Sequence, residues 1–184
     1  MEKKKQISRT YEIVTMALMA GVMCILGPMS IPIGLVPISF TNLVIYLAVY
    51  LLGAKKGTIS YLIYLLLGIF GLPVFSGYTG GLSKLGGPTG GYLIGFIFMA
   101  LITGYVIEIF KYQTMLSILG MVLATFIAYF FGTEWFVIQM KCSVKYALGV
   151  CVFPFLIGDL IKMIIASLLG PVIRKQLGKA DLLS

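Results

Sequence analysis

Long runs of apolar residues, interrupted only by short polar segments, limit most strongly what this chain can fold into. Hydrophobic residues make up 60% of the 184 residues, and charged residues make up only 11%. A soluble domain carries about 25% charged residues, so a water-exposed surface could not be covered here. Because a helix needs ~20 apolar residues to cross a bilayer, the length accommodates about six spans with short loops. The sequence therefore predicts an integral membrane protein.

Six apolar segments are predicted as transmembrane helices of a single all-α, polytopic membrane domain that covers residues 1–184. They lie at approximately residues 13–27, 38–52, 58–72, 92–110, 115–131 and 153–173. The three prolines in segment 28–37 predict a loop, and the sequence GAKKG at 53–57 predicts a tight polar turn. The second and third segments are shorter than the usual ~20 residues, so we expect them to be irregular or to continue into their flanks.

The distribution of basic residues predicts how these spans are oriented. If the N-terminus is cytoplasmic, ten of the fourteen basic residues fall on the cytoplasmic side: Lys3, Lys4, Lys5, Arg9, Lys55, Lys56, Lys111, Arg174, Lys175 and Lys179. Lys84, Lys141 and Lys145 fall outside, and Lys162 falls within the last span. This asymmetry follows the positive-inside rule. We therefore expect a multi-pass protein of the cell (plasma) membrane with both termini in the cytoplasm.

The absence of certain residues and motifs argues against several classes of function. It has no histidine, which removes histidine metal sites and Ser-His or Cys-His dyads. It has neither a phosphate-loop motif nor a G-x-G-x-x-G motif. We expect no enzyme activity, no metal and no cofactor. The net charge of +8 is explained by basic residues that orient the spans in membrane lipid. No nucleic-acid partner is therefore expected.

Asp159 and Lys162 are ionisable residues inside the otherwise apolar last segment. A charge near the bilayer centre costs at least ~2.5–3.5 kcal/mol, so its presence needs a reason. Three residues apart, the two side chains share one helix face. They could form an internal ion pair that locks the bundle, or a polar ligand site reached from outside. Asn42, in the second segment, could bond either another helix or that ligand.

A glycine-rich stretch from Gly77 to Gly91 lies between the third and fourth segments. Glycine allows positive φ and close approach of the backbone to a ligand, and consecutive free N–H groups can form an anion-binding nest. The stretch could be a flexible connecting loop or, as we prefer, a lid over the site. Lys84 is its only charged residue.

Small residues four positions apart occur in most of the predicted spans. Such spacing lets helices approach closely in lipid, either within the bundle or against another membrane protein. We favour contact with another membrane protein most for Ala17 and Gly21 in the first span. Near the membrane surfaces, Trp135 and Phe136 are predicted to be interface anchors, and Glu108 is predicted to be solvated.

Three segments of the chain resemble the BioY family. They are GLVPISFTNLVIYLAVYLLGAKKG, GLPVFSGYTGGLSKLGGPTGGYLIGF and PFLIGDLIKMIIASLL. The likeness covers about Val14 to Leu177, in the right order and spacing. GGPTGGYLIG and GDLIK are its most specific parts. BioY proteins are the biotin-binding S-components of energy-coupling factor (ECF) vitamin transporters.

The resemblance implies a six-helix bundle that captures biotin near the outer face. By motif position, Asp159 and Lys162 would bond the ureido ring, Asn42 would contribute, and Gly77, Tyr78 and Thr79 would lie in the lid. Some members carry an arginine where Thr79 stands, so the biotin carboxylate would here use Lys84, Thr79 or backbone N–H groups. The implied partners are a transmembrane coupling protein, docked on Ala17 and Gly21, and two ATPase subunits in other chains.

Other functions remain as alternatives to biotin capture. The chain could serve a different vitamin as an S-component, or it could be a structural membrane bundle in which Asp159 and Lys162 merely pair. A membrane enzyme would need a nucleophile, a base or a metal cluster, and the sequence offers none.

Overall fold

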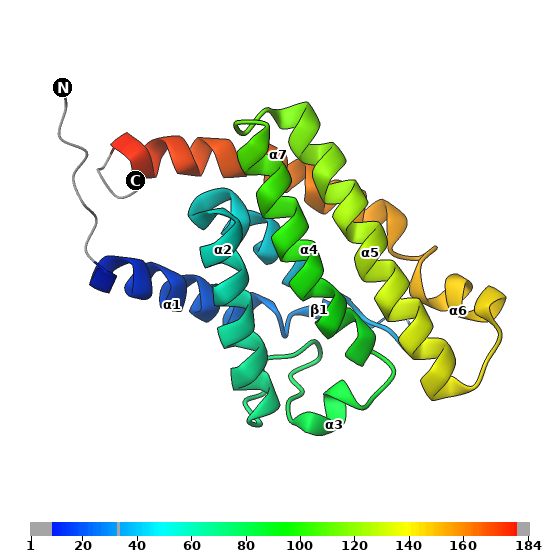
Figure 1. Ribbon diagram of the computed structural model, residues 1–184. Helices are drawn as coiled ribbons and strands as arrows, with labels where there is room; N and C mark the ends of the chain where they lie inside the picture. The colour runs from blue at the N-terminus through cyan, green and yellow to red at the C-terminus, as the bar shows by residue number, and fades with distance from the viewer. Residues whose placement is uncertain (1–8, 33, 180–184) are drawn as a thin grey trace.

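The computed structural model describes residues 9–32 and 34–179 of the chain and is mostly helical, as predicted. Within this part, five helices are long and apolar enough to cross a membrane (Figure 1). They are α1 (Arg9–Leu26), α2 (Thr41–Ile69), α4 (Gly90–Ile109), α5 (Thr114–Met140) and α7 (Leu156–Lys179). The predicted cytoplasmic residues Lys3, Lys4 and Lys5 lie outside the described residues.

The remaining elements are short and lie between the long helices. They are β1 (Ser30–Ile31), β2 (Ile38–Ser39), α3 (Leu82–Leu85) and α6 (Val144–Cys151). The two strands pair antiparallel, with Ser30 opposite Ser39. The loop predicted at 28–37 is thus part of a small β-hairpin, and residues 38 and 39 belong to this hairpin instead of the second span. Strands of two residues carry too little alternation to be recognised in a sequence.

The two predicted segments 38–52 and 58–72 lie in one helical element that is broken at a single residue. Gly53 has φ 83° and ψ 175°, whereas helical geometry resumes at Ala54. The prediction of a turn over 53–57 was therefore wrong, because a glycine that adopts positive φ can redirect the chain alone. Lys55 and Lys56 consequently belong to the second segment of α2.

Two charged side chains satisfy the backbone groups that this break exposes. Glu108 at the end of α4 accepts a hydrogen bond from the Ala54 N–H, with 2.8 Å between Oε1 and N. Arg174 of α7 donates to the carbonyl oxygens of Tyr50 and Leu51 over 3.0 and 2.9 Å. These bonds complete helix ends that would otherwise lack partners. Glu108 is exposed, in agreement with the prediction that it is solvated, and it also bonds the Ala54 N–H, which the sequence did not indicate.

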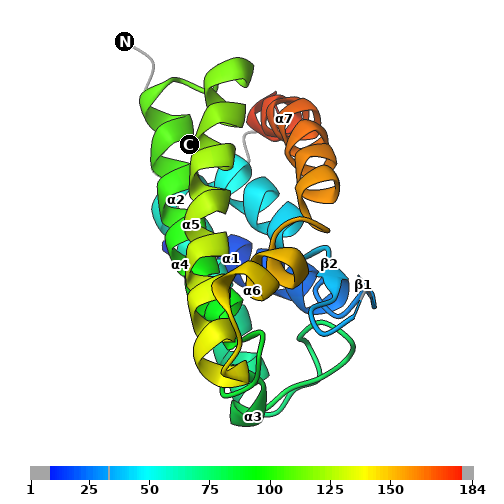
Figure 2. The same ribbon diagram turned by 90° about the vertical axis from the view of Figure 1, so that its right-hand side faces the viewer.

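The helices pack around α2 and α4. α4 lies between α2 and α5, α1 packs on α2, and α7 packs on α2 and α5 (Figures 1 and 2). Small residues bring the backbones close, because Gly95 of α4 lies against Ala128 of α5 and Gly104 lies against Ala54. Such contacts are the main means of helix association in lipid.

The fifth span extends further than its apolar pattern indicated. α5 continues to Met140, and it includes both predicted interface anchors. Phe136 is fully buried, so its assignment as an anchor was wrong. Trp135 is partly buried, and its indole N–H donates to the Gly87 carbonyl over 3.0 Å. Trp135 thus bonds the glycine-rich segment, and its assignment as an interface anchor stays a prediction.

We predict that Gly53→Ala destabilises the protein more than Gly34→Ala does. Both glycines have positive φ, 83° at Gly53 and 82° at Gly34, so both alanines incur backbone strain on the order of 1–3 kcal/mol. A Cβ at Gly53 would additionally displace the Glu108 carboxylate from its bond to the Ala54 N–H, whereas the space around Gly34 is open in the described structure. Apparent melting temperatures of the purified variants in detergent check this. Equal melting temperatures would contradict the capping function of Glu108.

Candidate functional site

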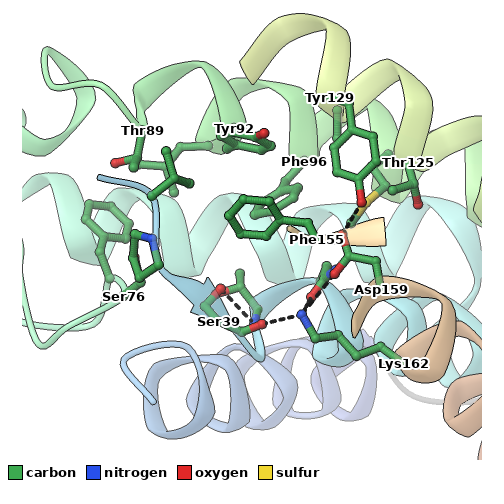
Figure 3. Close-up of a pocket in the computed structure, with 18 of the residues that line it drawn as sticks. Ser39, Ser76, Thr89, Tyr92, Phe96, Thr125, Tyr129, Phe155, Asp159 and Lys162 are labelled. Carbon is green, nitrogen blue, oxygen red and sulfur yellow. Dashed lines mark hydrogen bonds and ion pairs between the residues drawn. The ribbon is translucent and has the colours of Figure 1, made fainter. Parts of the chain in front are cut away.

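A pocket lies where the first turns of α2 and α7 meet, with walls from α4, α5 and the loops around β2 and α3 (Figure 3). One end of the pocket is polar, the middle is aromatic and aliphatic, and further polar residues come from the α2–α4 connection. Its lining is formed by Val36, Pro37, Ser39, Thr41, Asn42, Tyr64, Phe75, Ser76, Lys84, Thr89, Tyr92, Leu93, Phe96, Met99, Thr125, Ala128, Tyr129, Phe155, Asp159 and Lys162.

The polar end is built on the carboxylate of Asp159, which is only 5% exposed. Its Oδ1 accepts hydrogen bonds from Asn42 Nδ2 over 2.8 Å and from Lys162 Nζ over 3.0 Å. Its Oδ2 accepts a bond from the Tyr129 hydroxyl over 2.7 Å. A buried charge is tolerated only when it is paired and hydrogen-bonded. The structure thus brings together Asp159, Lys162 and Asn42, which the sequence singled out separately.

Lys162 connects this network to the loop that precedes α2. Its ammonium donates to the Ser39 carbonyl over 2.7 Å and to Asn42 Oδ1 over 3.0 Å, in addition to the ion pair with Asp159. An ammonium has three donors, and all three are used. Lys162 is therefore both the counter-ion of Asp159 and the anchor of the β2 strand.

The two central residues lie at the beginnings of their helices. Asp159 is in the first turn of α7, and Asn42 is the second residue of α2. Asp159 is closer to the helix end than the predicted span start near residue 153 implied, because α7 begins only after Pro154. The partial positive charge at a helix N-terminus favours an anion nearby. The carboxylate of Asp159 therefore lies where the dipole of α7 favours a negative charge.

The middle of the pocket is aromatic. Tyr92, Phe96 and Phe155 lie between the Asp159 network and the opposite side, where Ser76 and Thr89 are located (Figure 3). The Tyr92 hydroxyl donates to the Cys151 carbonyl, which ties α4 to the end of α6. An apolar body with a few convergent polar groups is typical of a small-molecule site.

Lys84 of α3, a predicted ligand-binding residue, also lines the pocket. It is half-buried in the same connection that supplies Ser76 and Thr89. Burial lowers the pKa of the Lys84 ammonium below its ordinary value, since desolvation disfavours the charged form. An anionic ligand group would offset this cost.

Gly77, Tyr78 and Thr79 are not among the described residues that line the pocket. Thr79 bridges back to Phe75, which does line it. The Gly77 N–H donates to the Pro28 carbonyl over 3.0 Å, and Tyr78 points outward with 68% of its surface exposed. The glycine-rich segment therefore contacts the hairpin loop, and both loops contribute to the pocket wall. Their action as a lid stays a prediction.

Tyr129 and Ser39 are site residues that the sequence analysis missed. Ser39 contributes a backbone carbonyl, which no residue pattern reveals. Tyr129 carries a weak signal, because Thr125 and Tyr129 are four residues apart and place two polar groups on one face of an apolar helix. Within the described residues, no group of three or more metal-ligating side chains occurs.

We predict that Lys162→Leu lowers the apparent melting temperature more than the double variant Asp159→Leu/Lys162→Leu does. The single change leaves a buried carboxylate without its counter-ion, which typically costs about 3–5 kcal/mol, whereas replacing both partners is often nearly neutral. Lys145→Leu, an exposed lysine, is the control. A double variant less stable than the single variant would show that the pair itself stabilises the bundle.

Comparisons with known proteins give matches over most of the chain. The model of the BioY family matches residues 1–179. The biotin transporter BioY2 of Lactococcus lactis is 33% identical over 178 residues, covering 96% of this chain and 97% of that protein. The biotin transporter BioY of Thermotoga maritima is 38% identical over 148 residues, covering 79% and 85%.

A solved structure is also similar. The crystal structure of the S-component for biotin from an ECF-type ABC transporter matches with a TM-score of 0.84 and 31% identity, covering 92% of this chain and 95% of that one. Together with the five apolar helices, these matches place the protein in the cell membrane as a multi-pass protein. The chain belongs to the BioY family.

Proposed function

We propose that this protein is a substrate-binding S-component that captures biotin at the outer face of the membrane for import. The observation that carries the proposal is the buried Asp159 network at one end of an aromatic pocket. Biotin has a ureido ring with N–H and C=O groups, an apolar middle and a carboxylate. The pocket offers a carboxylate acceptor, aromatic walls and the lysine Lys84 for these three parts.

The proposed topology has six crossings and both termini in the cytoplasm. The break at Gly53 divides α2 into two segments, each shorter than the ~20 residues of an ordinary span, and we count each as one crossing. The site then lies toward the outer side, whereas Lys55, Lys56, Lys111 and Arg174 lie on the cytoplasmic side, as the positive-inside rule requires.

The proposed partners are a transmembrane coupling protein and two ATPase subunits supplied by other chains. We place the coupling protein on α1, around Ala17 and Gly21. Both residues are exposed, and within the described chain a Cβ at Gly21 would meet open space. The apolar side chains beside them, Leu18 and Ile25, are 65% and 69% exposed. The two small residues permit close approach of another helix, and the apolar side chains offer it a contact surface.

We predict that purified protein binds biotin and that Asp159→Asn weakens binding about 100-fold or more. The exchange replaces a charged acceptor with an amide of the same shape, and hydrogen bonds to a charged, desolvated partner are worth about 2–5 kcal/mol. Equilibrium binding of radiolabelled biotin in detergent measures the effect, with exposed Glu134→Gln as the control. Undiminished binding by Asp159→Asn would remove Asp159 from the site. Competition by thiamine or riboflavin instead of biotin would favour a different vitamin.

We predict that Lys84→Ala weakens binding of biotin about fivefold, as expected for one partly exposed charge pair. Biotinamide, which lacks the carboxylate, should bind both proteins equally. Only the ammonium form attracts the carboxylate, so the preference for biotin over biotinamide should fall as pH rises through the Lys84 pKa. Because burial lowers that pKa, the fall should begin at lower pH than for an exposed lysine. A pH-independent preference would assign the carboxylate to other groups.

A further inference from the structure

The hydrogen-bonding capacity of Asp159 is nearly used up by the protein itself. A carboxylate has about four lone-pair positions. Oδ1 accepts from both Asn42 and Lys162, so its two positions are filled. Oδ2 accepts from Tyr129, which leaves one further position on this oxygen. A donor group of a ligand therefore meets Asp159 at Oδ2, beside the Tyr129 hydroxyl.

Lys162, the other charged group of the network, has no free hydrogen-bonding position. The three protons of Lys162 are directed to Ser39, Asn42 and Asp159 at 2.7–3.0 Å. A ligand carbonyl could reach Lys162 only by displacing one of these acceptors. A ligand N–H, in contrast, can bind Oδ2 of Asp159 without breaking any bond of the network.

The position of Tyr129 fixes the orientation of Oδ2 of Asp159. Tyr129 lies on α5, across the pocket from α2, and its hydroxyl points at Asp159 (Figure 3). Only 6% of the residue is exposed, and its ring lines the pocket together with the neighbouring Thr125. Asn42 and Lys162 hold Oδ1 from one side, and Tyr129 holds Oδ2 from the other. Without Tyr129 the carboxylate is held at one oxygen only and can rotate.

We propose that Tyr129 is a positioning residue for ligand recognition, whose hydroxyl fixes Oδ2 of Asp159 so that this oxygen accepts an N–H of the ligand. The inference rests on the proposed function, because the ureido ring of biotin supplies that N–H. Tyr129 thereby sets the preference for ligands with an N–H donor at this end of the pocket.

The test compares two buried tyrosines whose hydroxyl groups bond different side chains. Tyr46 is also buried and also bonds a side chain of α5, since its hydroxyl lies 2.6 Å from that of Thr125. Tyr129→Phe and Tyr46→Phe each remove one buried hydroxyl, so both should lower the apparent melting temperature, and Tyr129→Phe should lower it more because its acceptor is charged. Only Tyr129→Phe should weaken biotin binding, by about tenfold, as loss of one bond to a charged acceptor implies. Tyr46→Phe should change the Kd by less than about twofold, a small fraction of the energy of one such bond.

A double-mutant cycle with Asp159→Asn then tests whether Tyr129 acts through Asp159. In the background of the Asp159→Asn variant, measured with biotin up to millimolar concentration, Tyr129→Phe should cause no additional loss, because coupled residues are non-additive. Equal losses of affinity in both phenylalanine variants, or the same tenfold loss with and without the Asp159 carboxylate, would overturn the inference. Absence of biotin binding by the wild-type protein would overturn the proposed function itself, and the inference with it.

Discussion

The structure depends on one buried carboxylate that must be compensated in an apolar surrounding. Asp159 receives hydrogen bonds from Asn42, Lys162 and Tyr129, which come from three different helices. Transfer of an isolated charge out of water is prohibitively costly, so the network forms only when α2, α5 and α7 meet in one arrangement. The polar end of the pocket and the register of these helices are thus fixed by the same bonds.

The same requirement explains the irregular parts of the fold. The backbone groups freed by the break at Gly53 are bonded by Glu108 and Arg174, because unpaired groups at membrane depth are tolerated only beside protein or a cavity. Arg174 also lies 4.2 Å from the ring centroid of Tyr112, a distance typical of a cation–π contact. Charged residues near the membrane therefore complete backbone bonding as well as orient the protein.

The pattern of apolar segments in the sequence predicted most of the long helices. Two charged residues that interrupt this pattern predicted the centre of the candidate site. Asp159 and Lys162 stood out because ions are costly in lipid. The single-residue break at Gly53 did not stand out, since the basic residues after it resembled a longer turn. Tyr129 could not be distinguished from other tyrosines by type, and Ser39 acts through its backbone. Burial of Phe136 depends on tertiary packing, which local sequence does not encode.

The first segment of α2 and the helix α7 are joined at both of their ends. Asn42 and Asp159 join them at the pocket, and Leu51 and Arg174 join them at the far end. Two helices that are hydrogen-bonded at two separated points behave as one rigid unit, so they cannot separate at one end alone. Under the proposed function, the freedom needed to exchange a ligand would therefore come from the two loops that meet at Gly77 and Pro28. The entropy lost on binding would then be lost mainly in those loops, because the two helices are already ordered by bonds within the protein.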